Sequence, residues 1–204
     1  MALLPFAAVS IGKSSISGAA EHDLQVATFA GGCFWCVESD FDMVPGVVRT
    51  VSGYTGGSPK DPTYKQVSAG GTGHREAVRI FYDPTKVSYA TLLEIFWRSV
   101  DPTDDGGQFC DRGESYTTAI FANSPEQTRL AEDSKRELQE AAVLDRPVVT
   151  PIEAAGPFYP AETYHQEYYE KNPLRYKFYR YRCGRDARVK QLWGDDAHRG
   201  IGKH

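Results

Sequence analysis

The stretch LQVATFAGGCFWCVESDFDMVPG, residues 24–46, predicts a buried strand followed at once by a helix. Residues 24–30 form an apolar run of strand length, and the glycine pair at 31–32 interrupts it. Apolar residues then recur every three or four positions, the spacing of one helix face, at Phe34, Val37, Phe41 and Val44. A Pro-Gly pair at 45–46 ends the pattern. This strand–glycine–helix unit places Cys33 at the start of a helix.

The rest of the chain alternates strand and helix patterns. Strands are predicted at residues 47–54, 76–82, 116–121 and 148–154, and helices from 88, from 124 to about 142, and near 162–171. The Gly/Asp-rich loop at 101–115 is too long for a simple connector, and such loops tend to carry function. The order β-α-β-β-α-β predicts a single α+β domain with a mixed sheet and flanking helices, of split β-α-β type with a ferredoxin-like core. We expect this domain at 24–204, including an irregular C-terminal arm.

Composition narrows the class of protein. The chain has 204 residues, enough for a core of its own, and a formal net charge of −4. Its pI is about 5.7, and the absence of a Lys/Arg cluster argues further against non-specific nucleic-acid binding. No run of 18 apolar residues occurs, so the sequence predicts no membrane span. We expect a cytoplasmic monomer with neither nucleic-acid nor membrane partners.

The N-terminal extension, residues 1–23, leaves the compartment open. Residues 2–11 are mostly apolar and small residues follow at 18–20, which resembles a secretory signal and its cleavage site. However, a positively charged start is missing, and Lys13 follows the apolar run. A disordered extension is the simpler interpretation. A signal remnant would instead mean export to the periplasm.

Four cysteines are too few for a disulfide scaffold, so we expect their thiols to be free or buried. Cys33 is a candidate low-pKa thiolate, because the helix start offers unpaired N–H groups and the positive end of the dipole. With Cys36 it forms a C-x-x-C pair, which fits a redox dithiol, half of a zinc site or two structural thiols. Zinc is disfavoured because neither Cys110 nor Cys183 has another Cys or His at ligand spacing in the sequence. The two bulky aromatics inside the pair disfavour a thioredoxin-like enzyme.

Five motifs together resemble one family. They are GGCFWCVE at 31–38, SGYTGG at 52–57, GHREAV at 73–78, CDRGESY at 110–116 and FYPAETYHQEY…KNP at 158–173. Their order and spacing are those of the A-type peptide methionine sulfoxide reductases, and the similarity covers about residues 28–173. The resemblance implies a peptide-methionine (S)-S-oxide reductase. Such an enzyme repairs oxidised proteins or free methionine sulfoxide, uses no cofactor and is recycled by thioredoxin.

The resemblance also assigns roles to single residues. Cys33 matches the nucleophile and Glu76 the acid. Phe34 and Trp35 match the aromatics that receive the substrate methyl group. The polar groups expected around the sulfoxide oxygen are Tyr54, Asp111 and Tyr116. Without the resemblance, Tyr54 could equally be a loop anchor, and Tyr164 and His165 are more simply structural.

The chemistry of sulfoxide reduction requires groups of these kinds. A sulfur nucleophile must attack while the oxygen is protonated, because oxide is a poor leaving group. Glu76 would have to be protonated near neutral pH, so we expect burial to raise its pKa. Aromatic walls suit an S-methyl group, since sulfur–aromatic contacts contribute about 0.3–1.5 kcal/mol.

The recycling cysteine is where the chain departs from the family pattern. Many members carry glycine at the position of Cys36 and use cysteines in a glycine-rich tail, whereas this tail is basic and aromatic. A second thiol must condense with the sulfenic acid left on Cys33. We expect Cys36 first, Cys183 second and Cys110 third. The alternative function is a non-catalytic C-x-x-C redox switch or binding module.

Overall fold

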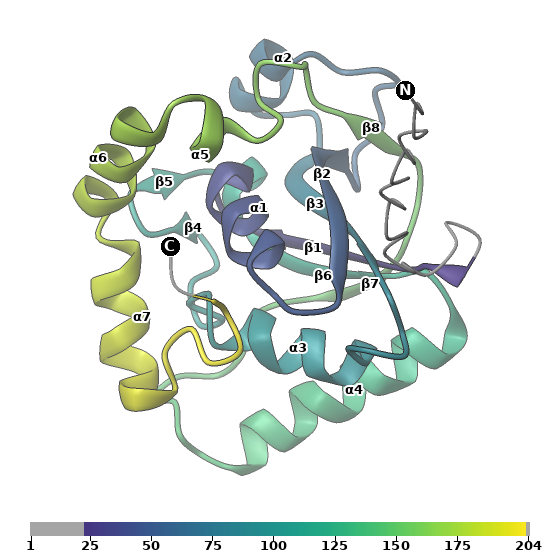
Figure 1. The fold of residues 1–204 in the computed structure, drawn as a ribbon, viewed down its shortest axis with the longest axis vertical. Coiled ribbons are helices and arrows are strands. Elements are labelled where there is room, and N and C mark those ends of the chain that lie inside the picture. The colour runs from purple at the N-terminus through teal and green to yellow at the C-terminus, as the bar shows by residue number, and fades with distance from the viewer. Residues whose placement is uncertain (1–22, 203–204) are drawn as a thin grey trace, which may run out of the picture.

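The computed structural model describes residues 23–202, so the expected extension lies outside the described residues except for Asp23. Within this range the main sheet has six strands in the order β7-β6-β1-β3-β2-β8 (Figure 1). The strands are β1 (Gln25–Gly31), β2 (Val47–Thr55), β3 (Arg75–Tyr82), β6 (Thr118–Ala122), β7 (Ile152–Ala154) and β8 (Phe158–Pro160). The helices are α1 (Phe34–Asp42), α2 (Tyr64–Ser68), α3 (Tyr89–Trp97), α4 (Pro125–Glu140), α5 (Tyr168–Lys171), α6 (Pro173–Cys183) and α7 (Arg185–Trp193). The expected single domain with a mixed sheet and flanking helices is confirmed.

Strand β3 lies between β1 and β2 and is antiparallel to both. The β1-α1-β2 segment is therefore a split β-α-β unit, as the pattern predicts. Three strand ends consequently meet along one edge of the sheet, the edge formed by strand ends: the C-terminal ends of β1 and β2 and the N-terminal end of β3. Cys33 follows β1 at this edge, and Glu76 pairs there with Tyr54. Three distant motifs are brought together by strand pairing alone.

The glycine pair makes the connection between β1 and α1 possible. Gly32 has φ +86°, a left-handed conformation that favours glycine. A Cβ on Gly32 would also lie 2.6 Å from the Cβ of Gln108. The long loop therefore packs directly against the turn that precedes Cys33.

Helices α1 and α3 cover one face of the sheet (Figure 1), and the core lies between these helices and the sheet. The ring of Phe29 on β1 stacks on Phe96 of α3, with centroids 4.9 Å apart. It also contacts Phe41 of α1 at 5.5 Å. The opposite face carries a smaller apolar cluster of Ala30, Ala77, Ala119 and Phe121. Within the described residues, no helix combines the length and apolar character needed to cross a membrane.

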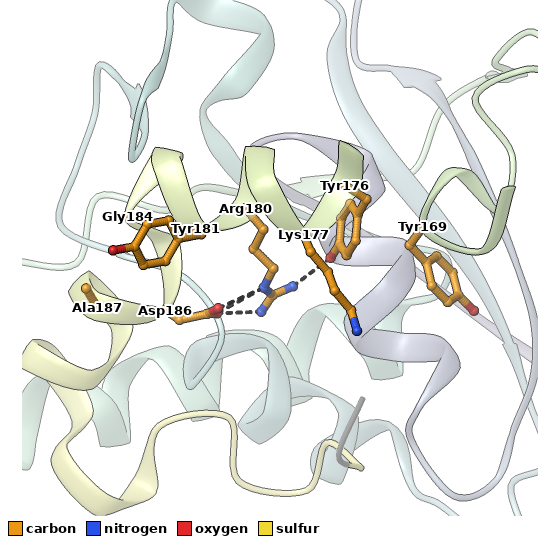
Figure 2. Close-up of a pocket in the computed structure, with 8 residues that line it drawn as sticks. All are labelled: Tyr169, Tyr176, Lys177, Arg180, Tyr181, Gly184, Asp186 and Ala187. Carbon is orange, nitrogen blue, oxygen red and sulfur yellow. Dashed lines mark hydrogen bonds and ion pairs between the residues drawn. The ribbon is translucent and has the colours of Figure 1, made fainter. Parts of the chain in front are cut away.

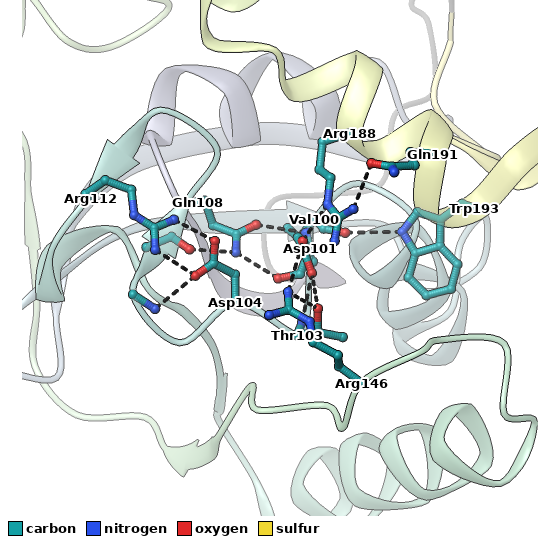
Figure 3. Close-up of polar contacts among 12 residues, drawn as sticks. Val100, Asp101, Thr103, Asp104, Gln108, Arg112, Arg146, Arg188, Gln191 and Trp193 are labelled. Atoms are coloured by element: carbon teal, nitrogen blue, oxygen red, sulfur yellow. Dashed lines mark hydrogen bonds and ion pairs between the residues drawn. The ribbon is translucent and has the colours of Figure 1, made fainter.

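The loop at 101–115 is held by a dense polar network (Figure 3). The Asp101 carboxylate accepts from the Thr103 backbone N–H at 3.0 Å and from Arg188 Nε of α7 at 2.8 Å. Arg112 donates twice to the Asp104 carboxylate, at 2.6 and 2.9 Å. The loop includes the short strands β4 (Gly107–Gln108) and β5 (Asp111–Arg112) and runs into a 3-10 turn at Glu114–Tyr116. A rigid loop can hold Asp111 and Tyr116 in place.

The C-terminal arm is helical, which corrects the expectation of an irregular arm. The helix expected near 162–171 is reduced to the four residues of α5, because Glu167 adopts a left-handed φ of 51°. Helices α6 and α7 follow, separated by Gly184 at φ 72°. Tyrosine and arginine occupy buried positions of these helices, so the usual aliphatic periodicity is missing. Figure 2 shows Arg180 held between Tyr176 and Asp186.

Candidate active site

A small cavity of about 60 Å³ opens at the sheet edge where β1 ends. Its walls come from α1, α2, β3, the loop at 101–115 and α6. The lining residues are Cys33, Phe34, Trp35, Tyr64, Glu76, Asp111, Tyr116 and Tyr179. Six of these were expected from the sequence, and Tyr64 and Tyr179 were not. The cavity brings a thiol, two carboxyl groups and three phenols next to two apolar rings.

Cys33 caps the start of α1, where its carbonyl accepts the N–H of Cys36 at 3.1 Å. The predicted position at a helix start is therefore confirmed, but the predicted low thiol pKa is wrong. Burial raises the pKa of Cys33 well above its ordinary value, and the neighbouring Cys36 and Glu76 add to the increase. The helix dipole is outweighed because removing a thiolate from water is costly. Cys33 is therefore a protonated thiol in this state.

Glu76 is buried beside the thiol. Its Oε2 accepts the backbone N–H of Phe34 at 3.0 Å, one of the unpaired donors at the start of α1. Burial, with the nearby charge of Asp111, raises the pKa of Glu76 from 4.5 to about 8. The expected raised pKa is confirmed, and this carboxyl group carries a proton at neutral pH.

The aromatic wall is built by residues far apart in the sequence. Trp35 stacks on Tyr168 with centroids 3.7 Å apart, and its indole N–H donates to His165 Nδ1 at 3.0 Å. Burial lowers the pKa of His165, which keeps the imidazole neutral and able to accept this bond. The His165 ring also contacts Phe34 at 5.0 Å. His165 thus contacts both rings of the apolar wall, Phe34 and Trp35.

Tyr54 lies behind the cavity and does not line it. Its hydroxyl donates to Glu162 Oε2 at 2.9 Å, and Glu162 Oε1 accepts the backbone N–H of Tyr64 at 2.9 Å. Tyr64 is the tyrosine that reaches the cavity, and its hydroxyl hydrogen bonds to that of Tyr116. Tyr54 therefore has the loop-anchor position, although the resemblance placed it beside the sulfoxide oxygen. The Thr63–Gln66 capping box predicts a helix start here, but not the direction in which Tyr64 points.

Asp111 and Tyr116 line the polar side of the cavity. The Asp111 carboxylate accepts the hydroxyl of Tyr179 from α6, and burial raises the pKa of Asp111. Burial and the charge of Glu76 raise the pKa of Tyr116, which therefore remains a neutral donor. Tyr179 lies in the Tyr/Arg-rich tail, where the sequence offers no motif that distinguishes it.

The four cysteines form two different pairs. Cys110 and Cys183 are joined by a disulfide, which corrects the expectation that the four cysteines are free or buried thiols. Cys33 and Cys36 are free, buried and hydrogen bonded to each other. The hydrogen bond from Cys33 lowers the pKa of Cys36, and the charges of Arg185 and Arg180 lower it further.

One group of metal-ligating residue types stands out in the described part of the chain. The ligand atoms of Cys110, Asp111 and Cys183 lie within 4.8 Å of one another. The disulfide takes up both sulfurs, however, and leaves one carboxylate. A single carboxylate is not a zinc ligand set.

Comparison with known proteins gives a consistent result. The family model described as peptide methionine sulfoxide reductase matches residues 25–197. Peptide methionine sulfoxide reductase MsrA of Bacillus licheniformis is 54% identical over 83% of this chain and 94% of its own. MsrA 2 of Rhizobium meliloti is 55% identical over 87% of both chains. The crystal structure of Mxr1 from Saccharomyces cerevisiae in reduced form superposes with a TM-score of 0.68 at 32% identity, covering 74% of this chain and 87% of Mxr1.

Proposed function

The chain belongs to the peptide methionine sulfoxide reductase family, and from this premise we propose how its residues reduce methionine sulfoxide. The enzyme is an oxidoreductase. One observation carries the assignment of roles: Cys33 and a carboxyl group with a pKa of about 8, Glu76, line the same cavity. A nucleophile and a protonated acid are the two groups that the reaction needs.

In the first step the Cys33 sulfur attacks the sulfoxide while Glu76 transfers its proton to the oxygen. The oxygen passes to Cys33: a bond forms between it and the Cys33 sulfur as the sulfur–oxygen bond of the substrate breaks, and the electron pair of the broken bond stays on the methionine sulfur. The oxygen remains on Cys33 as a sulfenic acid, and Glu76 recovers a proton from the Cys33 thiol. Because the pKa of Cys33 is raised, the thiol loses its proton within this step rather than before it. Methionine is reduced by two electrons and Cys33 is oxidised by two.

The cavity walls provide three different environments for a chiral sulfur. The methyl group lies against Phe34 and Trp35. The oxygen faces Glu76, with hydroxyl donors from Tyr64 and Tyr116 beside it. The methionine side-chain stem points to the cavity mouth. A site that fixes three substituents accepts one epimer, and we propose that it is the S epimer, free or in proteins.

Cys36 is proposed as the thiol that resolves the sulfenic acid. It is free, lies one helical turn from Cys33 and hydrogen bonds to it. Its lowered pKa favours the thiolate that attacks the Cys33 sulfur and releases the oxygen as water. Cys110 and Cys183 are bonded to each other in this structure, so neither offers a thiol. Thioredoxin, a dithiol reductant, then reduces the Cys33–Cys36 disulfide by thiol exchange.

Turnover with separated sulfoxide epimers tests the function. With dithiothreitol as reductant, the wild type should convert the S epimer to methionine and leave the R epimer unchanged. Cys33→Ser should be inactive. A redox switch or binding module would form no methionine from either epimer, and turnover of the R epimer alone would contradict the epimer assignment.

Peptide mapping of the disulfides tests the recycling step. The enzyme with Cys33 and Cys36 as free thiols and the Cys110–Cys183 disulfide intact is oxidised with one equivalent of the S sulfoxide and digested without reduction. We expect a dominant Cys33–Cys36 bridge. A dominant bridge from Cys33 to Cys183 or Cys110 would contradict Cys36 as the resolving thiol.

A further inference from the structure

Tyr179 brings a polar group from the C-terminal arm into the cavity. It lies on α6, more than a hundred residues from the catalytic motif, yet it lines the same small cavity as Cys33. Its ring meets Trp35 edge-on, with centroids 5.7 Å apart and planes at 82°. The ring is therefore fixed against the methyl-binding wall, and its hydroxyl is directed to the polar side.

The hydroxyl of Tyr179 lies between an acid and the nucleophile. It donates to Oδ2 of Asp111, and it is also within hydrogen-bonding range of the Cys33 side chain. A phenol has one proton to donate. In the resting site that proton goes to Asp111, and it is available to the Cys33 sulfur when this sulfur becomes negative.

Two interactions hold α6 in the position that this arrangement requires. Cys183 follows Tyr179 by one helical turn, and its disulfide partner Cys110 directly precedes Asp111. The bridge therefore ties the donor's helix to the acceptor's strand. On the inner side, Arg180 contacts Asp40 at 2.7 Å. It also contacts Asp186 at 2.7 Å (Figure 2).

We propose that Tyr179 is a positioning residue for sulfoxide reduction, orienting the Asp111 carboxylate and donating to the Cys33 sulfur as it ionises, with the Cys110–Cys183 disulfide as its staple. This inference rests on the proposed function. Losing one hydrogen bond to a charged group changes a rate or an equilibrium by at least about tenfold. The effect falls on the chemical step, because the ring that contacts Trp35 is unchanged in a phenylalanine variant.

The test uses a Cys36→Ser parent, in which Cys33 is the free thiol and each enzyme forms methionine once. In this parent, Tyr179→Phe should slow single-turnover methionine formation about tenfold and raise the midpoint pH of Cys33 alkylation by about one pH unit. Substrate affinity should change less than about threefold. The matched control is Tyr181→Phe, a hydroxyl on the same helix that is 82% exposed, and it should match the parent. Thermal unfolding of each variant verifies that the fold is kept.

Further variants separate positioning from packing. If Tyr179→Phe equals the parent in rate and alkylation profile, the proposal is overturned. Tyr179→Leu removes the ring as well as the hydroxyl, so a slow Tyr179→Leu beside a normal Tyr179→Phe would show that only packing matters. Cys183→Ser should also slow the single turnover. In the double variant with Tyr179→Phe, the fold-decrease in rate should be smaller than the product of the two single fold-decreases. Fold-decreases that simply multiply would refute the role of the Cys110–Cys183 disulfide in positioning Tyr179. A parent that forms no methionine would instead contradict the proposed function itself.

Discussion

The indole N–H of Trp35 donates to Nδ1 of His165 at 3.0 Å, although 130 residues separate the two in the chain. Trp35 comes from the catalytic motif and His165 from the turn before α5. The bond fixes the plane of the aromatic wall against which the substrate methyl group is proposed to lie. The C-terminal third of the chain thus controls the shape of a pocket that the N-terminal motif begins.

Replacing His165 by leucine should therefore weaken substrate binding. The substitution leaves the indole N–H without its acceptor, which costs about 1–3 kcal/mol, and frees the Trp35 ring to move. We expect KM to rise about tenfold with a smaller change in kcat, measured by steady-state reduction of the S sulfoxide. Tyr164→Phe, at the exposed neighbouring position, is the control and should behave as wild type. An unchanged KM would show that the Trp35–His165 bond does not shape the pocket.

Tyr54 and Tyr64, which flank one glycine-rich loop, should differ sharply when each loses its hydroxyl. Tyr64→Phe removes a donor inside the cavity and should lower kcat about tenfold to a hundredfold. Tyr54→Phe removes a bond to Glu162 behind the cavity, so it should lower the free energy of unfolding by about 1 kcal/mol and change kcat less than about threefold. Kinetics and urea unfolding of both variants check this. The opposite order of the kcat effects would return the substrate-binding role to Tyr54.

The rate of the chemical step should depend on the proton of Glu76. Its pKa of about 8 means that the single-turnover rate of the wild type should fall as the pH rises through about 8. Glu76→Gln retains an acceptor for the Phe34 N–H but cannot transfer a proton, so it should be slower by at least about a hundredfold and lack this fall. Single-turnover rates between pH 6 and 9.5 measure both. A decline with the same midpoint in the Gln variant would assign it to another group.

The same carboxyl group should affect stability with a defined sign. The pKa of Glu76 rises from 4.5 to about 8 on folding, so between these values the folded state binds more protons than the unfolded state. The free energy of unfolding therefore falls as the pH rises across this window, by up to about 1.4 kcal/mol per pH unit. Glu76→Gln lacks this contribution, and its stability relative to wild type should increase from pH 5 to pH 8. Parallel curves from urea unfolding would contradict this linkage; Glu38, whose pKa is raised to about 7, is common to both proteins.

Arg185 should be essential for the stability of the arm. It is 1% exposed and donates to the carbonyls of Gly31 and Ser99 at 3.0 and 2.9 Å. Arg185→Met leaves these carbonyls without their donors and removes the ion pair with Asp40 at 3.7 Å, so it should lower the free energy of unfolding by about 3 kcal/mol or more. The exposed Arg175→Met is the matched control, with an expected change below about 0.5 kcal/mol. A similar small change at both positions would contradict the structural role of Arg185.

The elements near the N-terminal motif were predictable because their signals are local. Strand β1, the glycine turn and α1 follow from apolar spacing within residues 24–46. The split arrangement also follows, since short connections leave few ways to pair three strands. The arm was not predictable, because α6 buries Tyr176 and Arg180 rather than aliphatic residues. From sequence, an arginine is predicted to be exposed, and only a long-range partner such as Asp40 makes its burial possible.

The site was predictable as a set of chemical groups and less so as an arrangement. Motif matching named six of the eight cavity residues, because the chemistry restricts which residue types can serve. It selected Tyr54 over Tyr64, since both lie near one glycine-rich loop and the sequence does not show which hydroxyl points inward. Tyr179 carried no signal of its own.

The sequence by itself determined the reacting groups: a cysteine at a helix start, two aromatics beside it and a glutamate that must hold a proton. Tertiary structure decided the state of these groups. Cys33 is a protonated thiol because it is buried next to Cys36 and Glu76, and Cys110 is a disulfide rather than a thiol because α6 brings Cys183 to it. Desolvation, charge–charge interactions and covalent pairing all depend on distances between residues far apart in the chain, and those distances exist only once the sheet and the arm have packed together.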